Sequence, residues 1–272
     1  MKVRDMRAGS DGIWFILEPA VATSGRLLVK SDISGNARIV ATIPPDTRLV
    51  GLTGTARGAA TVLVTKTQRT LTEFSVTGER LQSVSVGCYT AEGLVTIEGK
   101  AATVCPDGTI TRYDGTTAQK YSSWARPGTI PLIVGNRTLA VVDRATVGIL
   151  LNDIQAGTLS LVKPDVPEIA DSLKRIATAQ ASAAATARPG EAPFGTPLAV
   201  MDAVSDGMGL YLLIYPYHVP SGPTVVRLDS KGVPTARYRC VTGGDASVHK
   251  IAVKDGYLIL CSVNGSVYTF KL

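Results

Sequence analysis

The feature that most constrains this chain is a repeat of about 40 residues. In the stretch Ala199–Tyr238, four short apolar runs are separated by turn residues, and fainter copies of this unit follow one another along the 272-residue sequence. The copies share glycines between the third and fourth runs: Gly35, Gly78, Gly115, Gly157 and Gly232. Glycine suits tight hairpin turns because it adopts positive φ angles readily. Each unit is therefore expected to be four antiparallel strands.

An all-β chain with this period is typical of a β-propeller, and six units fit the length. We predict a single domain over 1–272, with four-stranded blades at approximately 1–46, 47–87, 88–126, 127–163, 196–244 and 245–272. In repeat form, nearly the whole chain resembles six-bladed propellers of the NHL-like and YWTD-like kind. It lacks a repeated Trp-Asp dipeptide, kelch-type paired glycines and a Tyr-Trp-Thr-Asp motif. The alternative, two β-sandwiches, does not explain one constant period.

The last unit reaches Leu272 after only its third strand, while the segment that begins at Val3 already has the pattern of an inner strand. We therefore expect the missing strand upstream of Met1, in a longer natural chain with a signal peptide before it. The alternative is a three-stranded last blade whose edge is protected.

One segment, 164–195, interrupts the strand pattern. Within it Glu168–Ala187 is predicted to be a helix, because Ile169, Leu173 and Ile176 recur at helical spacing. The segment joins a fourth strand to the next first strand, on the face where propellers usually bind ligands. It is expected either to be a lid or docking helix, or to pack its short apolar stripe on a blade.

The net charge of +6 is spread along the sequence, and no run of Lys or Arg exceeds two residues. Such a distribution is typical of a solvated basic surface and not of a nucleic-acid site. No apolar stretch of about 18 residues exists, so no membrane span is expected. The chain is expected to be a monomer.

The four cysteines occupy related places in the repeat. Cys88 and Cys240 follow fourth strands, whereas Cys105 and Cys261 lie at or near the ends of second strands, and these two kinds of connection share a face. We predict the disulfides Cys88–Cys105 and Cys240–Cys261; the alternative is four buried thiols. Disulfides would place the protein in an extracytoplasmic, bacterial periplasmic or secreted compartment. The alternative location is the cytoplasm.

No nucleophile elbow, phosphate-binding loop, zinc-binding helix or dinucleotide fingerprint is present, so no catalytic residue is assigned. Asp5 and Asp202 occupy equivalent positions on inner strands and could line the central channel. Six-bladed lactonase-like hydrolases hold calcium in this channel, and the two aspartates are candidates for its ligands. Two carboxylates alone are too few, because calcium needs about six oxygen ligands. No other cofactor is expected.

Tyr215, Tyr217 and His218 cluster on a loop bracketed by prolines, and Trp124 lies in another connection of the same face. Tyrosine and tryptophan are frequent at binding hot spots. The first hypothesis is therefore a non-enzymatic scaffold that holds a protein, peptide or glycan on this loop-rich face. The alternative is a propeller hydrolase or lyase with a channel-bound metal such as calcium.

Overall fold

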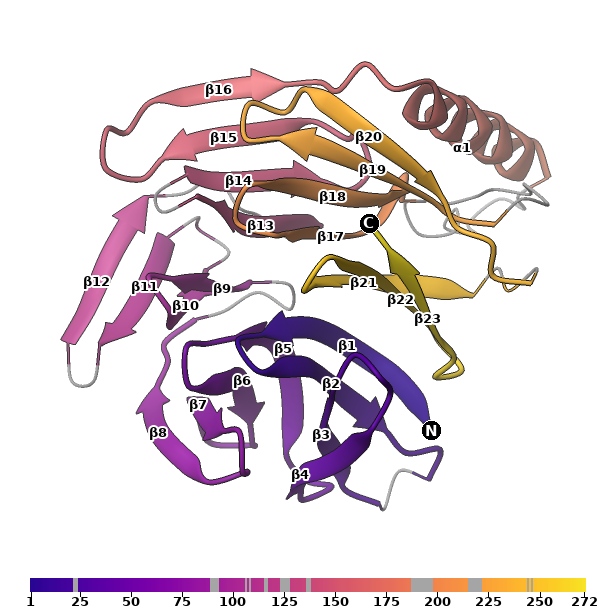
Figure 1. The fold of residues 1–272 in the computed structure, drawn as a ribbon. Helices are drawn as coiled ribbons and strands as arrows, with labels where there is room; N and C mark the ends of the chain where they lie inside the picture. The colour runs from indigo at the N-terminus through magenta and orange to yellow at the C-terminus, as the bar shows by residue number, and fades with distance from the viewer. Residues whose placement is uncertain are drawn as a thin grey trace.

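The chain forms six antiparallel β-sheets arranged around a central axis in a computed structural model (Figure 1). The structure describes residues 1–272 except 22–23, 89–92, 106, 108, 115–116, 123–127, 136–137, 187–197, 215–221, 244 and 246. Each sheet follows the previous one along the sequence, as the repeat predicts. The prediction of a six-bladed β-propeller is therefore confirmed.

The strands follow one another in chain order within each blade. Blades 1 and 2 consist of β1 (Lys2–Gly9), β2 (Gly12–Glu18), β3 (Arg26–Ser31), β4 (Ala37–Ile43), β5 (Arg48–Gly54), β6 (Gly58–Val64), β7 (Arg69–Ser75) and β8 (Arg80–Ser85). Blades 3 and 4 consist of β9 (Leu94–Ile97), β10 (Lys100–Val104), β11 (Thr109–Asp114), β12 (Thr117–Ser122), β13 (Thr129–Val134), β14 (Thr138–Asp143), β15 (Ile149–Asp153) and β16 (Leu159–Val162). Blades 5 and 6 consist of β17 (Val200–Ser205), β18 (Gly209–Ile214), β19 (Thr224–Asp229), β20 (Pro234–Arg239), β21 (Val248–Lys254), β22 (Tyr257–Ser262) and β23 (Val267–Lys271).

Burial falls from the second strand of a blade to its outermost strand, and the sequence patterns follow this gradient. Every residue of β18 is buried, because neighbouring blades cover both faces of the second strands. The outer strand β20 instead alternates between half-buried and exposed residues, with one face against the next blade and one face in water. Continuous apolar runs therefore form second strands, and alternating sequences form outer strands.

The six inner strands contact one another in the order β1, β5, β9, β13, β17, β21 and back to β1. They enclose a central channel of about 170 Å³, to which all six contribute. The ring closes where blade 6 meets blade 1. There Met6, Ile13 and Phe15 pack with Ala252 and Ile259 in one apolar cluster.

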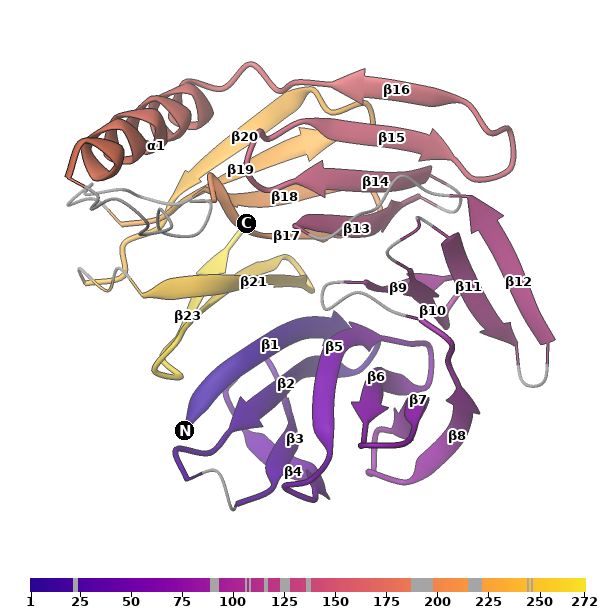
Figure 2. The same cartoon turned by 180° about the vertical axis from the view of Figure 1, so that it is seen from behind.

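Blade 6 contains three strands in the structure, in the order β21-β22-β23, whereas the other five blades contain four. The expected three-strand final unit is thus observed. The prediction of a helical insertion is also confirmed, by α1 (Pro167–Thr186). This helix lies against the outer part of blades 4 and 5 in both views (Figures 1 and 2). Its Ile169, Leu173 and Ile176 pack onto the apolar cluster shared by these blades, which matches the expectation of a packed helix.

Candidate functional site at the channel mouth

Three inner strands begin with the same irregularity, a β-bulge of one extra residue. The extra residues are Arg4 in β1, Met201 in β17 and His249 in β21. A bulge bends its strand and changes the direction of the side chains beside it. The residues that follow these three bulges are Asp5, Asp202 and Lys250, and they all meet at one end of the channel.

Asp202 is the centre of this cluster. The Arg7 guanidinium of blade 1 donates two hydrogen bonds to its carboxylate, at 2.9 and 3.3 Å, and the Ile251 N–H of blade 6 donates a third at 3.2 Å. Lys250 Nζ lies 3.2 Å from Asp5 and 4.0 Å from Asp202. Two carboxylates and two cations therefore neutralise one another, and the side chain of Asp202 is only 1% exposed.

The environment fixes the protonation state of Asp202. Burial on its own would raise the pKa of this carboxyl, because a charged group loses its hydration inside the protein. The charges of Arg7 and Lys250, with the hydrogen bonds from Arg7 and from the Ile251 N–H, outweigh burial and hold the pKa of Asp202 below its ordinary value. Asp202 is therefore an anion at neutral pH, and its charge is balanced inside the cluster.

Above this cluster the channel opens into a pocket of about 480 Å³ on the face where fourth strands connect to the next first strands. Six cationic and two acidic side chains line it: Lys2, Arg4, Arg7, Arg48, Arg144 and Lys250, with Asp5 and Glu18. Glu18 is paired with Arg26 at 3.0 Å. Lys2, Arg4 and Arg48 are exposed, and none of them has a salt-bridge partner in the described part of the chain. The pocket thus presents uncompensated positive charge to solvent.

His249 lies at the edge of this pocket. Its Nε2 is 3.2 Å from the carbonyl oxygen of Val3, which can only accept a hydrogen bond, so Nε2 carries the proton. Its Nδ1 is buried and has no hydrogen-bond partner among the described residues. Burial and the neighbouring Lys250 lower the pKa of His249. The imidazole is therefore a neutral group whose Nδ1 is left as an acceptor.

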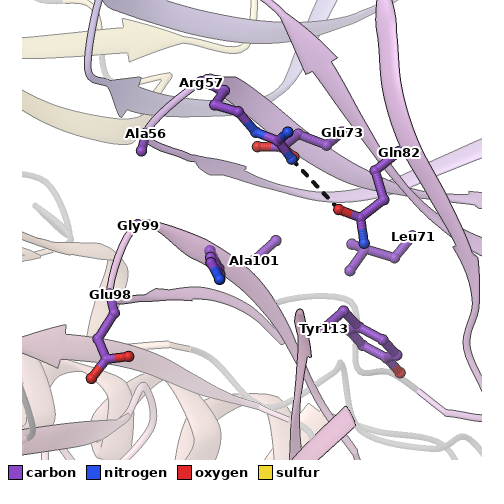
Figure 3. Close-up of a pocket in the computed structure, with 10 residues that line it drawn as sticks. Ala56, Arg57, Leu71, Glu73, Gln82, Glu98, Gly99, Ala101 and Tyr113 are labelled. Atoms are coloured by element: carbon purple, nitrogen blue, oxygen red, sulfur yellow. Dashed lines mark hydrogen bonds and ion pairs between the residues drawn. The ribbon is translucent and has the colours of Figure 1, made fainter. Parts of the chain in front are cut away.

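A second hollow, of about 490 Å³, lies between blades 2 and 3 near the opposite face (Figure 3). Its lining has two cations, Arg57 and Lys100, and two acids, Glu73 and Glu98, so its charges balance. Arg57 forms a salt bridge with Glu73 and lies 3.5 Å from Gln82, and Glu98 pairs with Arg112. This hollow has less unbalanced charge to offer a ligand than the channel mouth, which is why we select the channel mouth as the candidate site.

The structure brings together only part of the residues selected from the sequence. Asp5 and Asp202 meet at the channel, as their equivalent repeat positions predict. Among the described residues no group of three or more His, Cys, Asp or Glu could hold a metal ion, and the two aspartates already have Arg7 and Lys250 as counter-charges. This arrangement gives the calcium hypothesis no support.

The aromatic residues selected as a binding surface, Tyr215, Tyr217, His218 and Trp124, lie outside the described residues. Sequence reasoning missed Arg7, Lys250 and the three exposed cations Lys2, Arg4 and Arg48. A signal for Lys250 was present, because Val248-His249-Lys250 aligns with Val3-Arg4-Asp5 and Val200-Met201-Asp202 in the repeat. A cation stands in blade 6 where blades 1 and 5 have a carboxylate.

Of the two expected disulfides, the structure contains one. Cys88 and Cys105 are bonded, with their Cα atoms 5.2 Å apart. Cys240 and Cys261 are free and buried, so the second predicted disulfide is wrong. Burial raises the pKa of Cys240 to about 11, and burial with the charge of Asp245 raises that of Cys261 to about 12. Both remain neutral thiols that pack as small apolar groups.

Cys240 and Cys261 do not form a disulfide because Cys261 is offset by one residue from the repeat position of Cys105. Cys105 is the sixth residue after the turn glycine Gly99, whereas Cys261 is the fifth after Gly256. Side chains alternate between the two faces of a strand, so one residue changes the face. Cys261 packs toward blade 1, while Cys240 belongs to the cluster between blades 5 and 6. The sheet of blade 6 separates the two thiols.

No family model and no curated protein match the sequence. Solved structures do share the fold. One chain of the mitotic checkpoint complex has a TM-score of 0.59 and 9% identity, covering 100% of this chain and 90% of its own. A protein of unknown function from Bacteroides caccae has a TM-score of 0.54 and 12% identity, covering 92% and 85%.

The β-propeller domain of the trilobed protease from Pyrococcus furiosus, which has an open velcro topology, is also similar. Its TM-score is 0.53 at 8% identity, and the match covers 98% of this chain and 78% of that one. At such identities the common feature is the propeller fold alone. In the described part of the chain, no helix combines the length and the apolar character that crossing a membrane requires.

Proposed function

We propose that this chain is a single-domain, non-enzymatic binding module that holds an acidic segment of a protein partner at the channel mouth. The observation that carries the proposal is the group of exposed cations Lys2, Arg4 and Arg48 around the pocket of about 480 Å³, none of which has a salt-bridge partner among the described residues. A propeller presents such a pocket on a rigid ring, so a bound segment loses freedom while the protein loses little. The cationic pocket and the acidic segment also attract each other before they come into contact.

The buried ion cluster below the pocket supports a binding role in preference to a catalytic one. Arg7 and Lys250 are occupied by Asp5 and Asp202, so they fix the floor of the pocket and leave the outer cations for the ligand. The disulfide Cys88–Cys105 supports an oxidising, extracytoplasmic compartment, where such bonds persist.

The test is the binding of a labelled octaglutamate peptide, measured by fluorescence anisotropy at two salt concentrations. We expect Arg48→Gln and Arg4→Gln each to raise Kd about two- to fivefold, because an exposed ion pair contributes about 0.2–1 kcal/mol. Binding should weaken as salt rises. Lys231→Gln is the matched control, since Lys231 is an exposed cation in the β19–β20 turn, on the opposite face.

Equal weakening by Lys231→Gln would show attraction to the overall charge only and would refute the site. Tighter binding of heparin than of the peptide, with the same dependence on Arg4 and Arg48, would assign the pocket to acidic glycans and refute the protein partner. A large calcium-dependent rise in melting temperature that is lost in Asp5→Asn and Asp202→Asn would favour the metal-dependent enzyme.

A further inference from the structure

The outer edge of blade 6 has an unfilled strand position in the described part of the ring. Ser262 N–H donates to the Ser266 carbonyl, and Leu272 N–H donates to the Gly256 carbonyl. The register of β22 and β23 places both bonds in one alternating series, in which the even-numbered residues from 266 to 272 form their backbone hydrogen bonds on the side of β22. The N–H and C=O groups of Val267, Thr269 and Lys271 therefore point away from β22, and no described segment pairs with them.

Beside this edge lies an apolar groove of about 540 Å³ between β23 and the face of blade 1. Its lining includes Ile13, Phe15, Val29 and Ile259, and Val267 and Thr269 form its wall on the β23 side. The groove also gathers exposed apolar groups, since Met1 is 57%, Val267 49% and Ile33 37% exposed. An apolar face next to a row of unpaired backbone groups suits one kind of occupant, a β-strand.

The other blades show what occupies the equivalent place. Val40 and Ala41 of the fourth strand β4 pack into the cluster between blades 1 and 2, and Tyr238 of β20 packs between blades 5 and 6. The cluster between blades 6 and 1 contains no residue of β23 or of a fourth strand. In these two cases the position is covered by side chains of the blade's own fourth strand.

We propose that this groove binds an extended segment of a separate polypeptide, which pairs antiparallel with β23 as a fourth strand. Residues directly opposite in an antiparallel pair share a face. Val267, Thr269 and Lys271 face the groove, because they pair with Cys261, Ile259 and Tyr257 on the face of β22 toward blade 1. The partner residues opposite Val267 and Thr269 are therefore apolar.

The exposed Lys271 adds a charge requirement. It has no salt-bridge partner among the described residues, and it lies at the C-terminal end of β23. In an antiparallel pair this end faces the N-terminal part of the partner, so an acidic residue there completes the match. The segment has an acid followed by apolar residues at the second and fourth positions after it. This inference is independent of the proposed ligand at the channel mouth.

The test uses a labelled synthetic heptapeptide with glutamate at position two, valine at positions four and six and threonine elsewhere, and measures its binding by fluorescence anisotropy. Two N-methylated versions provide the decisive comparison. Methylation of both valine nitrogens removes the N–H groups that point to β23, and we expect at least a tenfold loss of affinity. Methylation of the threonines at positions three and five leaves the paired edge intact and should change affinity less than threefold.

Protein variants locate the peptide. Val267→Lys should weaken binding at least tenfold, whereas Val233→Lys, at a valine 54% exposed in the β19–β20 turn, should not. Thr269→Pro, which removes an outward N–H, should act like Val267→Lys. Melting temperatures confirm that each variant is folded.

Three results would overturn the proposal. One is equal affinity of the valine-methylated peptide, and another is an equal effect of Val233→Lys. The third is a dimer of the free protein that Val267→Lys dissociates in sedimentation velocity, because a second copy would then fill the groove.

Discussion

The two sides of the ring hold their inner strands together by different chemistry. Blades 2 and 3 meet through hydroxyl groups, with Thr53 and Thr96 Oγ1 atoms 2.7 Å apart, and the Cys88–Cys105 disulfide joins their connection to the residue that follows β10. Blades 1, 5 and 6 meet instead through the charged cluster around Asp202, which receives hydrogen bonds from blades 1 and 6.

The difference follows the path of the chain. Blades 2 and 3 are consecutive, so a short connection already holds them near each other. Blades 1 and 6 contain opposite ends of the sequence, and Arg7 and Asp202 are 195 residues apart. Bringing such distant segments together costs more chain entropy than closing a short loop. The charged contact between Arg7 and Asp202 is therefore found where no short covalent connection holds the blades together, at the closure of the ring.

Removing the charge of Asp202 should lower the stability of the folded protein more than any other change considered. Asp202→Asn leaves Arg7 and Lys250 to share Asp5 alone, and breaking a buried ion pair by removing one partner typically costs about 3–5 kcal/mol. We expect a loss of stability in this range, measured by urea unfolding at pH 7.5.

Glu18→Gln is the matched control, because it breaks the more exposed pair with Arg26, whose contribution should stay below about 1 kcal/mol. If the two variants lost equal stability, the cluster would not be the main polar closure of the ring.

Removing the Cys88–Cys105 disulfide should cause the second-largest loss of stability. Its cysteines are 17 residues apart, and a loop of this size contributes roughly 3 kcal/mol in the chain-entropy model. We expect the double variant Cys88→Ser/Cys105→Ser to lose about that much stability and to become insensitive to dithiothreitol, which should destabilise the parent protein.

Thiol titration of the oxidised protein gives the matching count. Unfolded, unreduced protein should show two free thiols, Cys240 and Cys261, and the native protein none, since both are buried. Four thiols in protein prepared under oxidising conditions would contradict the assignment.

The repeat determined most of the fold in advance, because hairpin turns and strand alternation are local properties. It predicted β17 to β20 and the three-strand blade 6, and the helical spacing of Ile169, Leu173 and Ile176 predicted α1 in the segment that interrupts the repeat. The repeat failed to predict that Cys240 and Cys261 stay apart, because a shift of one residue along a strand moves a side chain to the opposite face. Cys240 N–H bonds to the Pro223 carbonyl as Val86 N–H bonds to the Arg69 carbonyl, so Cys240 corresponds to Val86, two residues before Cys88.

The site was less predictable than the fold for a related reason. The repeat showed that Asp5 and Asp202 are equivalent, but not that a bulge precedes each of them or that Arg7 lies between them. The exposed cations Lys2 and Arg48 belong to different blades and come together only when the ring forms. Residues of different blades become neighbours only in the closed ring, so the sequence of a single repeat cannot predict that they line one pocket.

The smallest expected effect is a pH dependence on the charged side of the ring. Burial, with Lys250, lowers the pKa of His249 below its ordinary 6.5, and outweighs the hydrogen bond to the Val3 carbonyl and the charges of Asp202 and Asp5, which act in the opposite direction. The unfolded chain therefore binds a proton at this residue more readily than the folded protein. The contribution of neutral His249 to the free energy of unfolding is therefore fully present above pH 6.5 and declines as the pH falls below this value. Asp202 stays ionised in this range, because its pKa is held below 3.8.

His249→Gln should reduce this decline, because glutamine can donate to the Val3 carbonyl without titrating. The measurement is the difference between urea midpoints at pH 7.5 and pH 5.5, which should be smaller in the variant than in the parent. His218→Gln controls for the other histidine. If only His218→Gln reduced the difference, protonation at the ring closure would not be the cause, and the charged side would be no more sensitive to mild acid than blades 2 and 3.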